Sequence, residues 1–150
     1  MSNANRVGAS TQQGFDAVLL GAAFGVSAAT VANNTANIAI LSGGLTNSAN
    51  TQTSGMAIAK RIVVANPSAD LSLVSISVGQ FSNGGGLIAN AQALSALTAI
   101  NTYQSLTPSL AANPTCLNGN ISNALYVNQT ANTVAGGTFD IFIYGDVVKP

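Results

Sequence analysis

The chain has 150 residues, and 47% of them are hydrophobic, which is enough apolar material for one folded domain. It carries four Lys or Arg, four Asp or Glu and no His, so its formal net charge is zero and charged residues make up only 5% of the chain. Four cations release few counterions from a phosphate backbone, which argues against nucleic-acid binding, and a surface with so little charge repulsion favours a protein that works within an assembly.

The first 56 residues predict an N-terminal arm and a linker. Residues 1–14 are small and polar with no hydrophobic periodicity, which is typical of an extended arm. Residues 42–56 are rich in Gly, Ser, Thr and Asn, and this composition favours a linker. We therefore expect a compact β-domain over residues 57–150, with the arm contacting either that domain or neighbouring subunits.

Between the arm and the linker, apolar residues recur at a spacing of seven. They are Ala17, Phe24, Val31, Ile38 and Leu45, and Leu41 falls on a partner position. This spacing would suit a coiled coil, but several glycines in the segment each cost about 1 kcal/mol in a helix interior. A short helix or paired strands around residues 30–41 is the simpler interpretation, and an oligomeric helical seam is the alternative. Polar residues interrupt the apolar run over residues 14–32, so we expect no membrane helix.

Residues 60–81 carry the strongest strand signal in the chain. Three β-branched residues at 62–64 suit a pleated sheet. The segment 66–70 stops this run because Pro67 has no N–H to donate and the flanking Asn and Asp bond nearby backbone groups. From residue 74 to residue 79 apolar and small residues alternate, which is the period of a half-buried strand. The pattern predicts a β-hairpin.

The next segments predict a turn, a short strand and a helix. Residues 83–86, Asn-Gly-Gly-Gly, favour a hairpin turn over a phosphate-binding loop, because no Lys-Ser/Thr or helix-opening GxGxxG pattern follows. Residues 87–89 then predict a short strand. Over residues 91–100 apolar side chains recur every three residues, and Asn90 offers an N-cap, so we expect the domain's one short helix there.

Three further segments complete the predicted β-domain. Residues 103–110 and 124–129 each predict a strand or an extended segment. In the last strand, 138–145, Phe and Ile alternate on one face while Phe142 and Tyr144 lie on the other. Because both faces carry apolar bulk, we expect this strand to lie centrally or to face a partner subunit. The fold class that follows is mainly β, an antiparallel sandwich or barrel with one short helix.

The sequence offers little equipment for catalysis. Acid–base catalysis near neutral pH most often uses His, and a nucleophilic Ser or Cys would lack an imidazole partner. The single cysteine, Cys116, is expected to be a small core residue, and no Cys/His cluster exists for zinc. A glycosidase-like carboxylate pair would have to come from Asp16, Asp70, Asp140 and Asp146. We expect no enzymatic activity, no catalytic or metal-binding residue, no cofactor and no small-molecule substrate.

Lys60 and Arg61 form the only basic pair in the chain. Such a pair could bind a carboxylate on a neighbouring subunit or an anionic glycan. The simpler expectation is that strand alternation sends one side chain to solvent and the other to Asp70 or Asp140.

Four segments of the C-terminal half together resemble small virion proteins of tailed bacteriophages: KRIVVANPSADLSLVSISV, GGGLIANAQALSALTAINTYQSL, ALYVNQ and TFDIFIYGDVV. The resemblance covers roughly residues 57–148 and is one of pattern, so no functional residue is transferred by motif. It implies a capsid decoration (cement) or head-surface protein: non-enzymatic, often trimeric, and clamping subunits of the major capsid protein on the outside of the virion.

The resemblance and the composition together predict a structural virion protein that stabilises a capsid as a homotrimer on the capsid surface, without nucleic acid or membrane. The expected assembly contacts are Phe24, Val31, Ile38, Leu41, Phe142 and Tyr144. One alternative is a head or tail fibre, or an adhesin-like knob, that binds a host surface glycan through Asn-rich loops. A secreted β-domain with a neutral exterior and the capsid shell subunit itself are further alternatives.

Overall fold

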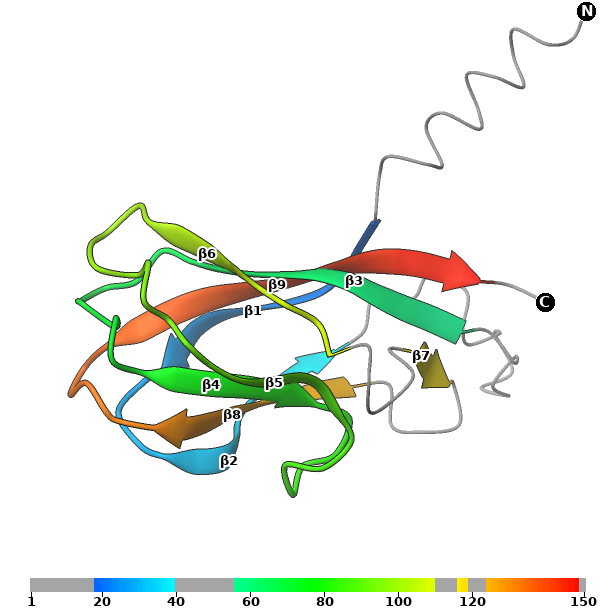
Figure 1. Ribbon diagram of the computed structural model, residues 1–150, viewed down its shortest axis with the longest axis horizontal. Coiled ribbons are helices and arrows are strands. Elements are labelled where there is room, and N and C mark those ends of the chain that lie inside the picture. Colours follow the sequence, from blue (N-terminus) through cyan, green and yellow to red (C-terminus); the bar gives the residue numbers. More distant parts are fainter. Residues whose placement is uncertain (1–17, 40–55, 110–115, 119–123, 149–150) are drawn as a thin grey trace, which may run out of the picture.

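Two antiparallel sheets lie one above the other in the computed structural model, which describes residues 18–39, 56–109, 116–118 and 124–148 (Figure 1). The first sheet has the order β1 (Val18–Ser27), β9 (Thr138–Val148), β3 (Met56–Ala65), β6 (Tyr103–Leu106), and β7 (Cys116–Asn118) also pairs with β3. The second has the order β2 (Ala32–Ala39), β8 (Ala124–Ala131), β4 (Ser75–Gly79), β5 (Leu87–Ala93). The predicted antiparallel, mainly β fold is confirmed as a sandwich, and neither sheet closes into a barrel.

Strand β9 lies inside the first sheet and is hydrogen-bonded to β1 on one side and to β3 on the other. Phe139, Ile141 and Ile143 are at most 1% exposed and point toward the second sheet. Phe142 and Tyr144 lie on the opposite face and are half-buried. The central position expected from apolar bulk on both faces is therefore confirmed.

The two sheets enclose one apolar core, since the inward-facing positions of both carry aliphatic side chains and one Phe. Its fully buried members include Leu20, Ile62, Val64, Phe139, Ile141 and Ile143 of the first sheet, and Ile38, Ile76, Val78, Ile88, Leu125 and Val127 of the second. Burial of this apolar area is the main force that holds the sheets together.

Residues 18–39, which we expected to precede the β-domain, contribute one strand to each sheet. β1 pairs with β9 and β2 pairs with β8, so the sandwich begins before residue 57. Of the two interpretations of residues 30–41, a strand is correct, but β2 pairs with β8 rather than with a strand beside it in sequence. The predicted arm, residues 1–14, and most of the predicted linker lie outside the described residues.

The segment between β3 and β4, residues 66–74, crosses from one sheet to the other. The hairpin expected here is wrong, although both of its strands exist. Leu71 and Val74 are fully buried, so their side chains anchor the segment across the end of the core instead of letting it turn back on β3. Ser68 and Thr138 hold the crossing, because each donates its backbone N–H to the other residue, at 2.9 and 2.8 Å.

The glycine-rich turn is confirmed, since β4 and β5 form an antiparallel hairpin closed by residues 80–86. Gln80 N–H donates to Gly86 O at 3.0 Å, and Gly84 N–H donates to Phe81 O at 3.1 Å. Gly84 and Gly86 have φ values of 85° and 62°, which glycine adopts without a steric penalty.

The short helix predicted over residues 91–100 is wrong, because no described residue lies in a helix. The segment begins as the end of β5 and continues as turns. Gln104 of β6 replaces the helical hydrogen bonds: its Nε2 donates to Ala93 O at 2.8 Å, and its Oε1 accepts from Ala96 N–H at 2.9 Å. Both leucines of the segment are fully buried, so their three-residue spacing serves the sandwich core.

Candidate functional site

The outer face of the first sheet gathers aromatic side chains from three strands. Residues paired directly across an antiparallel ladder point to the same face, so the pairings of Tyr144 with Arg61 and of Phe142 with Val63 place these side chains together. Phe24 of β1 joins them, because its ring lies 5.6 Å from that of Phe142, edge to face at 81°. We call the outward side chains Phe24, Arg61, Tyr103, Phe142 and Tyr144 the aromatic face.

The aromatic face is unusually open for side chains of this kind. Phe24 is 71% exposed and Tyr103 is 69% exposed. The Arg61 guanidinium carbon lies 5.5 Å from the centre of the Tyr144 ring, which is within the range of a cation–π interaction. The sheet thus presents a rigid platform of aromatic rings with one cation stacked on it.

A β-bulge places Phe24 on this face. The β1–β9 register shifts between Ala23 and Val26, so that Phe24 and Gly25 both lie opposite Asp140. Gly25 has a φ of 61°, and its N–H donates to Asp140 Oδ1 at 2.9 Å. The other carboxylate oxygen, Oδ2, accepts from Asn66 Nδ2 at 2.9 Å. Asp140 therefore ties the bulge to β9 and to the start of the crossing segment.

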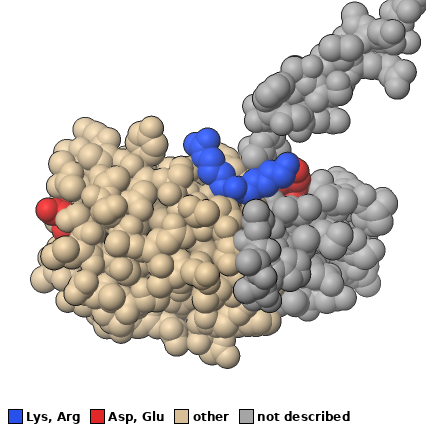
Figure 2. Space-filling model, in the orientation of Figure 1, with Lys and Arg blue, Asp and Glu red and all other residues tan. Residues whose placement is uncertain are grey.

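The basic pair behaves differently from the sequence-based expectation. Lys60 forms its salt bridge with Asp146, not with Asp70 or Asp140. Arg61 stacks on Tyr144 and has no acidic partner in the described part of the chain. Figure 2 shows the basic side chains together, with one acidic group beside them and another at the far edge of the molecule.

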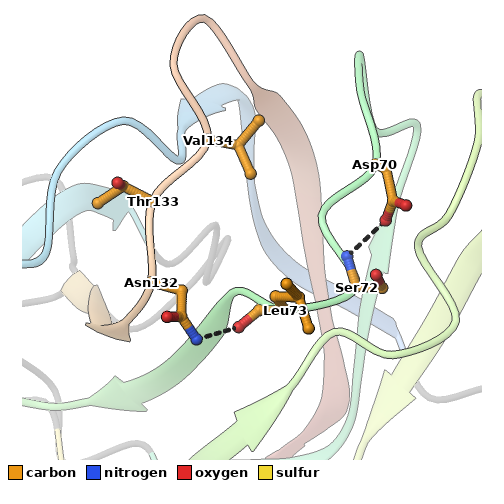
Figure 3. Close-up of a pocket in the computed structure, with 6 residues that line it drawn as sticks. All are labelled: Asp70, Ser72, Leu73, Asn132, Thr133 and Val134. Carbon is orange, nitrogen blue, oxygen red and sulfur yellow. Dashed lines mark hydrogen bonds between the residues drawn. The ribbon is translucent and has the colours of Figure 1, made fainter.

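A shallow pocket lies at one end of the sandwich, between the crossing segment and the loop that joins β8 to β9 (Figure 3). Its volume is about 420 Å³, and it is lined by Asp70, Ser72, Leu73, Asn132, Thr133 and Val134. Asn132 Nδ2 donates to Leu73 O at 2.7 Å and so links the two loops. The Leu73 side chain is 75% exposed, so an aliphatic group faces solvent at this end of the sandwich. We call this feature the loop-end pocket.

Asp70 is the one charged residue of the loop-end pocket. Hydrogen bonds from the Ser72 hydroxyl and then from the Ser72 backbone N–H lower the pKa of the Asp70 carboxyl. The backbone bond to Oδ1 is 2.9 Å long. The carboxylate is therefore ionised at neutral pH, and no described cation pairs with it.

The lowered pKa of the Asp70 carboxyl can be measured directly, because NMR follows the titration of each carboxyl group separately. The pKa of Asp70 is lower in the folded chain than in the unfolded chain. The ionised carboxylate therefore stabilises the fold at pH values above the unfolded-state pKa, and this contribution is lost as the pH falls through the folded-state pKa. We expect an NMR carboxyl titration to show the Asp70 midpoint below the usual Asp value. Ser72→Ala should move the midpoint upward, whereas Ser82→Ala should leave it unchanged; an unmoved midpoint in Ser72→Ala would contradict the assignment.

Comparison with known proteins gives no match. No family model matches the chain, and no curated protein and no solved structure matches it either. The resemblance to phage decoration proteins therefore stays a prediction.

Three of the six predicted assembly contacts meet on the aromatic face, namely Phe24, Phe142 and Tyr144. Val31 is 49% exposed but lies in the link between β1 and β2. Ile38 is fully buried in the core, so a surface contact through its side chain is excluded. Leu41 lies outside the described residues.

Two members of the aromatic face, Arg61 and Tyr103, were not predicted as contacts. Nothing in the local sequence joins them to Phe142, since that neighbourhood arises from the pairing of β3 with both β6 and β9. Within the described residues, no group of three or more His, Cys, Asp or Glu could hold a metal ion. The same part of the chain has no helix able to span a membrane.

Proposed function

We propose that this protein is a non-enzymatic structural virion protein that decorates a phage capsid as a homotrimer, binds the major capsid protein, and uses the aromatic face for its assembly contacts. The observation that carries the proposal is the aromatic face itself: Phe24 and Tyr103, 71% and 69% exposed, stand on a rigid sheet of a chain that is only 5% charged. The resemblance over residues 57–148 supplies the class of assembly.

The composition of the aromatic face suits a protein–protein contact. Tyr and Arg are enriched among the residues that carry most of the binding energy at interfaces, and Phe is enriched at interfaces generally. Aromatic side chains bury about 150–250 Å² each, and buried apolar area stabilises by roughly 25 cal/mol per Å². The backbone beneath these rings is hydrogen-bonded within the sheet, so little ordering is needed when a partner binds.

A glycan-binding knob is the second candidate, and the loop-end pocket favours it. Asp70, Ser72 and Thr133 offer acceptors and hydroxyls, while Leu73 and Val134 offer an aliphatic surface on which a sugar ring could pack. Stoichiometry separates the two candidates. A decoration protein should be present in many copies per virion at local three-fold positions, whereas a fibre knob should be present in few copies at vertices or tail.

The proposal is tested by measuring the copy number of the protein in purified virions and its binding to capsid shells that lack it. Phe24→Ser should weaken shell binding strongly, because Phe24 is the most exposed ring of the aromatic face. Ile100→Ser is the matched control: Ile100 is also 71% exposed, but it lies in the link between β5 and β6. Few copies per virion, or equal loss of binding in both variants, would contradict the proposal.

A further inference from the structure

Within the described residues, two exposed charged side chains have no oppositely charged partner. Five charged side chains are described, and Lys60 pairs with Asp146. Asp140 accepts hydrogen bonds from Gly25 N–H and Asn66 Nδ2. Asp140 is half-buried, whereas Arg61 and Asp70, one positive and one negative, are exposed; among the described residues, Asp70 accepts hydrogen bonds only from its neighbour Ser72. In a chain with so few charges, two unpaired charges of opposite sign are an unusual feature.

The two unpaired charges lie in different parts of the fold, each beside exposed apolar groups. Arg61 is on strand β3 and lies against the rings of the aromatic face. Asp70 lies in the crossing segment at the loop-end pocket, next to Leu73 and close to Val134. The aromatic face thus combines aromatic rings with a cation, and the loop-end pocket combines an exposed aliphatic side chain with an anion.

We propose that the protein associates head to tail with further copies of itself, the Arg61 guanidinium of one copy binding the Asp70 carboxylate of the next while Leu73 packs on the aromatic face. This inference deepens the proposed function and rests on it, since it names a second copy as a partner of the same face. Each copy uses its aromatic face once and its loop-end pocket once. A heterologous contact of this kind closes into a ring when the rotation between copies allows, and a trimer is such a ring.

The loop-end pocket is held in place before any partner binds. Asn132 bonds Leu73 O at 2.7 Å, and the reciprocal bonds between Ser68 and Thr138 fix the crossing segment to β9. Asp70 itself is oriented by Ser72 N–H. A preorganised anion and a preorganised cation lose little side-chain freedom on pairing, and surrounding apolar groups strengthen their attraction by excluding water.

Charge exchange on the full chain tests the contact. Arg61→Asp and Asp70→Arg should each weaken self-association by about 30-fold or more, as loss of a buried interfacial charge pair does, measured by sedimentation velocity over a range of concentrations. The double variant Arg61→Asp/Asp70→Arg should restore association, because the same pair forms with its charges exchanged. Thr130→Asp and Thr130→Lys, at an exposed position of β8, control for an added negative charge and an added positive charge.

A mixture of the two single variants gives a sharper result. Each variant repels itself but complements the other through both surfaces, so the equimolar mixture should recover association that neither variant shows alone, and native mass spectrometry should detect assemblies that contain both variants. Failure of the double variant to recover, or a monomeric parent chain at high concentration, would overturn the head-to-tail contact. If the head-to-tail contact is overturned but the protein is present in many copies per virion, the proposed function stands. If the double variant recovers association but the protein is absent from virions, the proposed function alone is overturned.

Discussion

Ile141→Ala is expected to lower the free energy of unfolding by about 2–5 kcal/mol, the range for removing a fully buried large aliphatic side chain. Ile141 is 0% exposed on β9 and lies between Ala23 of β1 and Val64 of β3. Its neighbours belong to hydrogen-bonded strands on both sides, which limits how far they can close the cavity. Since domains have about 5–15 kcal/mol of stability in total, urea denaturation should show a large shift of the midpoint.

Phe142→Ala is the matched control on the next position of the same strand. Its side chain points to the outer face, where it makes an edge-to-face contact with Phe24 that is worth about 0.5–1.5 kcal/mol. We therefore expect a small loss of stability but a clear loss of self-association and of capsid binding. If Phe142→Ala destabilised the fold more than Ile141→Ala, the assignment of inner and outer faces on β9 would be wrong.

Strand β9 shows what local sequence pattern can predict. The alternation over residues 138–145 determines which side chains share a face, because successive residues of a strand point to opposite sides. Apolar bulk on both faces indicated a central strand, and the pairing of β9 with β1 and β3 confirms it. The same alternation selected Phe142 and Tyr144, which lie on the aromatic face.

Two of the failed predictions, the hairpin and the helix, share a physical cause, since each assumed that neighbours in sequence would satisfy one another. The turn signal at Pro67 was real, but Leu71 and Val74 are buried, so the chain crosses to the second sheet. The helical spacing over residues 91–100 was also real, but Gln104 takes the backbone groups that a helix would have paired. In both cases long-range burial and hydrogen bonding outweighed a local preference.

The heptad spacing selected one exposed residue and one buried residue for a similar reason. Phe24 and Ile38 are fourteen residues apart, and a helix would have placed them on one stripe. They instead lie in different sheets, where Phe24 points outward from a bulge and Ile38 points into the core. A bulge shifts the alternation by one residue, and no local sequence feature shows which strand opposes it.

Asp140→Ala is expected to lower the free energy of unfolding by about 2 kcal/mol and also to weaken assembly. The carboxylate accepts from Gly25 N–H and from Asn66 Nδ2, both at 2.9 Å, and hydrogen bonds to charged groups contribute about 1.5–3 kcal/mol each when sheltered from water. These bonds are solvent-exposed, which reduces their combined contribution toward the lower value. Because Gly25 follows Phe24 in the bulge, loss of the bond should also loosen the ring on the aromatic face.

Asp140→Asn separates the loss of the hydrogen bonds from the loss of the charge. The amide oxygen of the new asparagine side chain can still accept from Gly25 N–H. Its NH₂ group can donate to the Asn66 side-chain oxygen once the Asn66 amide turns over. We therefore expect less than half of the destabilisation seen in Asp140→Ala. A double-mutant cycle of Asp140→Ala with Asn66→Ala should give a coupling energy of about 0.5–1.5 kcal/mol, because the two side chains contact directly. A coupling near zero would show that the bond between Asp140 and Asn66 contributes nothing to stability, and the bond from Gly25 N–H would then account for the whole effect of Asp140→Ala on the bulge and on self-association.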